Sequence, residues 1–126
     1  MPKNAAGKGT VVVATVHGDV HDIGKNIVKV VAQSYGFEVV DLGKDVPKEK
    51  VVEAALRIRP LAVGLSALMT TTVASMEETI RALREAGCTA KIFVGGAVLT
   101  AEIAREIGAD CYTANALGFV KALESL

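Results

Sequence analysis

A chain of 126 residues falls within the size range of one domain and is long enough to bury a core between layers of helices and strands. Lysine plus arginine and aspartate plus glutamate each total 14, so no charge excess favours nucleic acid or an anionic membrane surface. The apolar runs are far shorter than the roughly 20 residues of a membrane span, and no signal-peptide pattern opens the chain, so we expect a cytoplasmic protein with small-molecule or protein partners.

The predicted elements alternate between strand and helix along the chain. Residues 1–9 are polar and small, which indicates a flexible leader. A β-branched run at residues 10–16 predicts a strand buried on both faces. Apolar side chains at helical spacing between Ile23 and Ser34 predict a helix that stops at Gly36. By the same reasoning we predict strands at residues 37–42, 61–65, 91–94 and 110–113, and helices at residues 48–58, 76–86, 102–107 and 116–123.

Strict alternation with crossover helices implies a five-stranded parallel sheet, doubly wound and flavodoxin-like (Rossmann-like), flanked by helices. We assign residues 10–126 to this single domain. Ligands of such sheets bind beyond the carboxyl ends of the strands, near the point where the strand order reverses. A site is therefore expected among the loops at residues 17–24, 43–47, 66–75, 95–99 and 114–118.

The first of these loops carries two histidines and two acids within six positions, in the stretch HGDVHDIGKN. It does not fit a phosphate loop, because five residues rather than four separate its first glycine from the Gly-Lys pair and Asn26 follows the lysine. A zinc site of His17 and His21 is disfavoured, because they lie on a strand end and a loop rather than on one helical face. Asp22 is better explained as the cap of the helix that starts near Gly24.

Asp19 and His21 lie two positions apart in this irregular loop. The Asp19 carboxylate can accept a hydrogen bond from one imidazole nitrogen of His21 while the other nitrogen faces a metal. That arrangement orients a ligating histidine and raises its basicity. The alternative is that His21 is merely exposed and that Asp19 caps the following helix.

The pattern Asp19-x-His21-x-x-Gly24 resembles the signature of the cobalamin-binding domain family. Two further elements of that family are a Ser-x-Leu after the third strand and a Gly-Gly after the fourth. They stand here at residues 66–68 and 95–96. Three motifs, in order and each on a loop selected by counting strands, are more specific than any one of them alone. The resemblance spans residues 10–126.

The resemblance implies that a corrinoid binds with its nucleotide tail in a slot beside the sheet and with His21 as the lower axial ligand of cobalt. Ser66 is similar to the family serine that bonds the tail base, and small residues at two strand ends would leave room for the tail. Alone, the Gly95-Gly96 pair would also fit an ordinary turn. The implied cofactor-binding residues are Gly18, Asp19, Val20, His21, Asp22, Ile23, Gly24, Ser66, Leu68, Thr70, Gly95, Gly96, Ala97, Asn115 and Ala116.

Relatives of the methionine synthase type add a hydroxyl six positions beyond the Ser-x-Leu serine, which is Thr72 here. It would complete a relay with Asp19 and His21, and we assign the catalytic role to these three residues. Those relatives carry proline and serine where Thr71 and Thr72 stand, so the hydroxyl is kept while the rigid proline is not. The alternative is that Thr70, Thr71 and Thr72 cap the following helix.

The stretch DVHDIGKNIV resembles methyl-transferring corrinoid proteins more than carbon-skeleton mutases. It implies a carrier, rather than an enzyme in its own right, that holds methylcobalamin or a related corrinoid and shuttles the methyl group between methyltransferase proteins while cobalt supplies the chemistry. A small subunit of an adenosylcobalamin-dependent mutase and a corrin-binding sensor stay open as alternatives. The family's helical cap precedes this domain, and we expect it to be absent here, because only nine residues stand before the first predicted strand.

Overall fold

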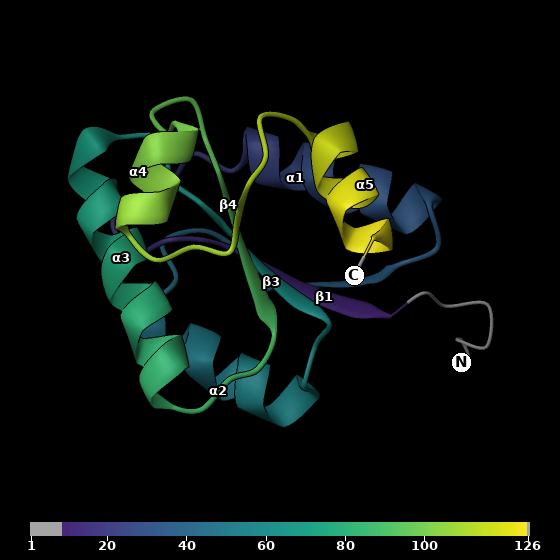
Figure 1. Cartoon of the computed structure of the whole chain (residues 1–126), viewed down its shortest axis with the longest axis horizontal. Helices are drawn as coiled ribbons and strands as arrows, with labels where there is room; N and C mark the ends of the chain where they lie inside the picture. Colours follow the sequence, from purple (N-terminus) through teal and green to yellow (C-terminus); the bar gives the residue numbers. More distant parts are fainter. Residues whose placement is uncertain (1–8, 126) are drawn as a thin grey trace.

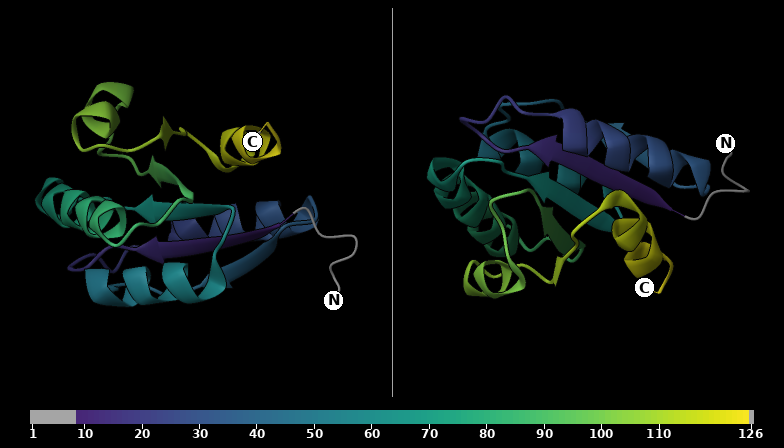
Figure 2. Two further views of the ribbon diagram at one scale, coloured as in Figure 1. Left: turned by 60° about the horizontal axis from the view of Figure 1, so that its bottom comes forward. Right: turned by 90° about the horizontal axis from the view of Figure 1, so that it is seen from above.

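The computed structural model describes residues 9–125, in which five strands alternate with five helices. The strands pair in parallel in the order β2-β1-β3-β4-β5, and Figure 2 shows β1 and β3 running side by side in the same direction. This confirms the predicted doubly wound sheet. The predicted leader lies outside the described residues except for Gly9. The strands are β1 (Thr10–Thr15), β2 (Glu38–Asp41), β3 (Ala62–Ser66), β4 (Lys91–Gly95) and β5 (Cys111–Tyr112), and the helices are α1 (Ile23–Ser34), α2 (Lys48–Ile58), α3 (Thr70–Glu85), α4 (Ala101–Glu106) and α5 (Ala116–Glu124).

The sheet separates two hydrophobic clusters, because successive side chains of a strand point to opposite faces. In β1, Val12 and Ala14 face the cluster formed with α2, α3 and α4, whereas Val11 and Val13 face the cluster formed with α1 and α5. Figure 1 shows α1 and α5 together on one side of the sheet and α2 and α3 on the other. Burial on both faces explains why this strand reads as a continuous apolar run.

The helices are short, and the longest, α3, has 16 residues. Within residues 9–125 no helix is both long and apolar enough to cross a membrane.

Helix α3 begins at Thr70, within the segment predicted to be a loop up to Ser75. The Thr72 hydroxyl accepts a hydrogen bond from the Met69 backbone N–H at 3.3 Å and so caps the first turn. A run of β-branched threonines has a low helix propensity, which is why the sequence alone placed this start too late.

Helix α1 exposes most of the apolar residues that mark it in the sequence. Ile23 is 77% exposed, Ile27 54% and Val30 60%, whereas the side chain of Lys25 is only 4% exposed. A helix that buries a lysine and exposes isoleucines is not oriented by core packing alone. Its exposed face borders the site described next.

Candidate functional site

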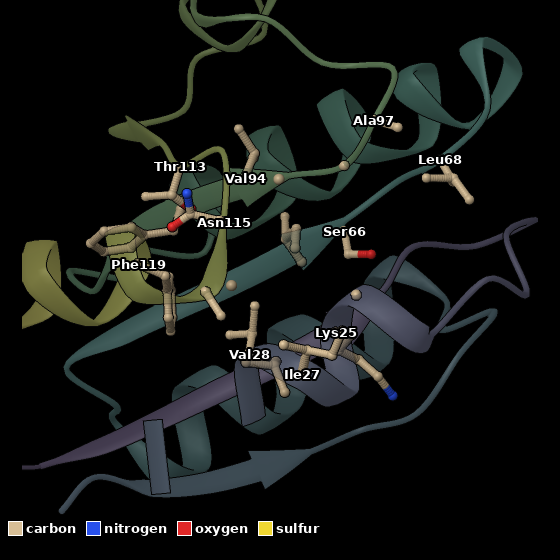
Figure 3. A pocket seen from close by; sticks show the side chains of 18 of the residues that line it. Lys25, Ile27, Val28, Ser66, Leu68, Val94, Ala97, Thr113, Asn115 and Phe119 are labelled. Carbon is tan, nitrogen blue, oxygen red and sulfur yellow. The ribbon is translucent and has the colours of Figure 1, made fainter. Parts of the chain in front are cut away.

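A pocket of about 660 Å³ opens between one face of the sheet and the helices α1 and α5. Gly64 and Phe93 of the sheet line it. Ile27 and Val28 of α1 and Phe119 of α5 line it from the helices (Figure 3). The pocket reaches the loops that follow β1, β3 and β4, where a doubly wound sheet is expected to bind its ligand. Its volume and its mostly apolar walls are typical of a small-molecule site.

The deep end of the pocket depends on a glycine in the middle of β3. A Cβ atom added at Gly64 would lie 3.3 Å from Val13 Cγ1 and 3.5 Å from the Phe119 ring. That ring packs edge to face against Phe93, with centroids 5.1 Å apart. Any larger residue at position 64 would therefore displace one of these side chains.

Gly96 allows the backbones after β3 and β4 to come together. It has a φ of +139°, and an added Cβ atom would lie 1.8 Å from the Ala67 carbonyl oxygen. Only glycine fits there without moving the chain. Gly95 is less restricted, since its Cβ atom would lie 3.3 Å from the Thr113 carbonyl oxygen. Both glycines line the pocket and also form the turn after β4, so the two interpretations of this pair are compatible.

Among the hydroxyl groups on the pocket side of the sheet, those of Thr15 and Ser66 have no partner among residues 9–125. Thr15 Oγ1 is buried without a hydrogen bond, and Ser66 lines the pocket at the end of β3 with its hydroxyl unpaired (Figure 3). Asn115 differs, because its Oδ1 accepts from Gly118 N at 2.8 Å and caps α5. Ser66 is half-buried and faces the pocket, so its hydroxyl is available to a polar group of a ligand.

The carboxylate of Asp19 lies fully buried behind the mouth of the pocket and accepts four hydrogen bonds. Oδ1 accepts from His21 N at 3.0 Å and lies 2.8 Å from His21 Nδ1. Oδ2 accepts from Leu68 N at 2.7 Å and from Thr72 Oγ1 at 2.8 Å. Burial raises the pKa of Asp19, but these hydrogen bonds outweigh it and hold the pKa far below its usual range. The carboxylate is therefore ionised at neutral pH.

An ionised Asp19 fixes which nitrogen of His21 carries a proton. Because a carboxylate only accepts hydrogen bonds, Nδ1 must be the donor, and in the neutral ring Nε2 then keeps a free lone pair. The His21 side chain is 47% exposed and lines the pocket. Nε2 is thus available to a metal.

His17 does not share this environment, because its Nδ1 lies 3.2 Å from Asp45 Oδ1. In the part of the chain that the structure describes, no three histidine, cysteine or acidic side chains gather as a metal-binding group. The arrangement gives no support to a zinc site of His17 and His21.

Most of the predicted cofactor-binding residues line the pocket. They are Val20, His21, Asp22, Ile23, Gly24, Ser66, Leu68, Gly95, Gly96, Ala97, Asn115 and Ala116. Gly18, Asp19, Thr70 and Thr72 do not line it. Asp19 and Thr72 lie behind His21, Gly18 donates its N–H to Asp45, and Thr70 is exposed at the start of α3.

The prediction that Asp22 caps α1 is wrong. Asp22 stands at the N-cap position, but its side chain makes no capping hydrogen bond and lines the pocket instead. Its φ of −118° and ψ of 9° differ from the extended backbone that a capping residue usually adopts. The capping interpretation of the threonine run holds for Thr72, which also donates to Asp19.

Sequence reasoning missed the wall that α1 contributes, namely Lys25, Ile27 and Val28. A signal was present, since apolar residues cover more of this helix than one core-facing stripe needs. The Lys25 stem lines the pocket, while its Nζ lies 2.7 Å from Asp41 Oδ1 at the end of β2. Burial raises the pKa of Asp41, but hydrogen bonds from Lys25 and the Gly43 N–H outweigh it and lower the pKa. This ion pair fixes the first turn of α1 to the sheet.

Comparison with known proteins identifies the family. The model of the B12 binding domain matches residues 9–118. Dimethylamine corrinoid protein 2 of Methanosarcina mazei is 51% identical over 120 residues, which cover 92% of this chain and 56% of that protein. The dimethylamine corrinoid protein of Methanosarcina barkeri is 46% identical over 130 residues, covering 100% of this chain and 61% of that protein. The chain thus spans little more than half the length of these relatives.

Solved structures agree with this assignment. A cobalamin-binding protein from Desulfitobacterium hafniense superposes with a TM-score of 0.89 at 41% identity, covering 92% of this chain and 58% of that one. A chain of the methanol:cobalamin methyltransferase complex of Methanosarcina barkeri superposes with a TM-score of 0.86 at 37% identity, covering 94% of this chain and 45% of that one. The receiver protein CheY4 of Vibrio cholerae gives 0.68 at 17% identity, covering 92% and 97%, and shares the fold alone. With the pocket at the expected edge of the sheet and a family match over most of its length, the chain belongs to the B12 binding domain family.

Proposed function

We propose that this chain is the carrier domain of a corrinoid-dependent methyltransferase system. In this proposal the pocket takes the nucleotide tail of the cofactor, Nε2 of His21 takes the lower axial position on cobalt, and a methyl group is passed between partner proteins. The observation that carries the proposal is His21 at the edge of a deep apolar pocket, with its Nδ1 hydrogen-bonded to a buried carboxylate.

The residues present fit a corrinoid. A lone histidine is too few ligands for a metal held by protein alone, but it suits a metal that arrives with its equatorial ligands. The unpaired Ser66 hydroxyl offers a hydrogen bond inside an otherwise mostly apolar slot. The exposed apolar side chains of Val20, Ile23 and Leu68 stand around the pocket and would be covered by a large flat ligand.

The cofactor supplies the cobalt chemistry of accepting and releasing the methyl group. The protein's part is to control the lower ligand. Asp19 holds Nδ1 of His21 protonated and orients the ring, and Thr72 and the Leu68 N–H keep that carboxylate in place. A protonated His21 ring would stay paired with the Asp19 carboxylate, so Asp19 would stabilise the ring when it is not bound to a metal.

The relatives suggest the class of partner. Those that are about half identical are named dimethylamine corrinoid proteins, and a homologous chain stands in a methanol:cobalamin methyltransferase complex. We therefore propose that the methyl donor is a small methylated compound, most closely a methylamine, activated by a separate methyltransferase protein. A mutase subunit or a sensor would bind an adenosyl corrinoid in the same pocket, and neither is favoured by these relatives.

Electron paramagnetic resonance of the reduced Co(II) form tests the ligand assignment. Labelling every histidine with ¹⁵N should change the nitrogen splitting of the cobalt signal relative to unlabelled protein. In His21→Ala the splitting from the histidine nitrogen should be absent. The chain has two histidines, both in the same loop, so His17→Ala is a matched control and should keep the splitting. Equal splitting in wild type and His21→Ala would refute the assignment.

A further inference from the structure

Asp45, in the loop between β2 and α2, has an unusual backbone conformation. Its φ is +53°, and among residues 9–125 only Arg59, at the end of α2, is another non-glycine residue with positive φ, at +55°. Aspartate tolerates the left-handed region better than most residues because its short polar side chain bonds locally. Such a conformation persists where the surrounding contacts determine it.

The contacts of Asp45 are with the loop that carries His21. Asp45 Oδ1 accepts a hydrogen bond from Gly18 N at 2.8 Å, and Asp45 N donates to the Asp19 carbonyl oxygen at 2.9 Å. Asp45 therefore holds the Gly18–Asp19 segment at both its ends. The same Oδ1 lies 3.2 Å from His17 Nδ1.

The loop that carries Asp45 is itself firmly attached to β1. Thr15 N donates to the Gly43 carbonyl at 2.9 Å, and Val46 N donates to the Thr15 carbonyl at 3.0 Å. Val16 and Val46 form a further parallel bridge beyond the ends of the named strands. Residues 43–46 thus form a fixed support beside the His21 loop, which is otherwise irregular.

We propose that Asp45 is a positioning residue for the axial ligand. By clamping Gly18 and Asp19 it holds the Asp19 carboxylate where His21 Nδ1, Leu68 N and Thr72 Oγ1 can all reach it. A site of this kind must be held to within about 0.5 Å, and supporting residues supply that precision. The inference rests on the proposed function of His21 and extends it to a residue of another loop.

The action of Asp45 is geometric rather than electrostatic. Its side chain is 52% exposed, so water screens its charge. Asp45→Asn keeps an acceptor oxygen and tolerates the left-handed backbone, whereas Asp45→Gly relaxes the backbone and removes the acceptor. Arg59→Gly is a matched control, because it makes the same backbone change at an exposed left-handed position away from the site.

The test loads each variant with cob(II)alamin and follows, by absorption and electron paramagnetic resonance, the pH at which His21 leaves cobalt. Asp45→Gly should raise that midpoint by about half to one pH unit, a three- to tenfold weaker ligation, which is the effect of about one lost hydrogen bond. Asp45→Asn and Arg59→Gly should stay near wild type. Corrinoid affinity measured below the release midpoint, where His21 is off cobalt, should be unchanged, since Asp45 does not line the pocket.

A readout without cofactor separates this inference from the proposed function. In the apo protein, ¹⁵N spectra of the His21 ring should show the Nδ1–H tautomer in wild type and Asp45→Asn, and a mixture of tautomers in Asp45→Gly. The positioning role would be overturned if the His21 tautomer in Asp45→Gly were the same as in wild type, or if Asp45→Asn changed the tautomer as much as Asp45→Gly. Complete loss of corrinoid binding in Asp45→Gly would also overturn it. If His21 of the wild type did not ligate cobalt while the tautomer differences were still observed, the proposed function would be overturned and the positioning role of Asp45 would stand.

Discussion

Replacing Gly96 with alanine tests whether the turn after β4 holds the His21 site together. The new Cβ atom would lie 1.8 Å from the Ala67 carbonyl oxygen, where ordinary contact begins at 3.4 Å. The two backbones must therefore separate by about 1.5 Å. The φ of +139° adds strain for any residue with a side chain. The backbone displacement and the strain should together lower the free energy of unfolding by about 3–5 kcal/mol.

The displaced residue, Ala67, precedes the residue whose N–H bonds Asp19. Leu68 N lies 2.7 Å from Asp19 Oδ2, and a shift of about 1 Å would take that pair beyond hydrogen-bond distance. In protein that still folds, Gly96→Ala should thus weaken His21 ligation as well as stability.

Urea unfolding of the apo protein measures the first effect, and the pH midpoint of His21 release from cob(II)alamin measures the second. Gly95→Ala is the matched control, since its Cβ atom would meet the Thr113 carbonyl at 3.3 Å and needs an adjustment of only a few tenths of an ångström. It should cost about 1 kcal/mol or less. A Gly96→Ala protein as stable as Gly95→Ala would refute the reasoning.

Two further predictions concern the side chains around the site. Thr72→Val removes the donor to Asp19 Oδ2 and the cap of α3. The free energy of unfolding should fall by about 1–2 kcal/mol, and His21 should leave cobalt at a higher pH. Thr72→Ser should restore both properties, whereas an unaltered pH midpoint in Thr72→Val would remove Thr72 from the relay. Lys25→Met should cost about 2 kcal/mol at neutral pH. The pKa of Asp41 is lower in the folded state than in the unfolded state, so the Lys25–Asp41 pair stabilises the fold above about pH 4. This stabilisation is lost as the pH falls through the pKa of Asp41 in the folded state. The difference in unfolding free energy between wild type and Lys25→Met should therefore shrink in acid. A difference independent of pH from 7 to 3 would contradict that assignment.

The features that the sequence predicted well are those that depend on local pattern. The alternation of β-branched runs and helical spacing predicted the five strands and their parallel orientation, since crossover connections leave few alternatives. Strand counting then selected five loops, of which four contribute residues to the pocket, whereas the loop at residues 43–47 does not. The segment 48–58, bounded by Pro47, coincides with α2 as the structure has it.

The features that it did not predict depend on groups distant along the chain. Asp45 stands 26 positions from Asp19, and the hydrogen bond between them joins two backbone groups that carry no sequence signal. The backbone N–H of Leu68 is equally silent in the sequence, although it makes the shortest hydrogen bond to Asp19. Asp22 failed as a cap because the loop before α1 takes its conformation from these distant contacts rather than from the local preference of aspartate.

The proposed function assigns binding of the cofactor and control of its lower ligand to different parts of this fold. The slot lies between the sheet and the helices α1 and α5, with Gly64, Phe93 and Phe119 at its deep end. Asp19 and Thr72 lie outside that slot, and they reach the metal position only through His21. Substitutions in the slot should therefore change corrinoid affinity without changing the pH of histidine release. Substitutions around Asp19 should change that pH and leave the affinity of the histidine-off form unchanged. In the proposed carrier, this separation would let the axial ligand change while the slot keeps the cofactor.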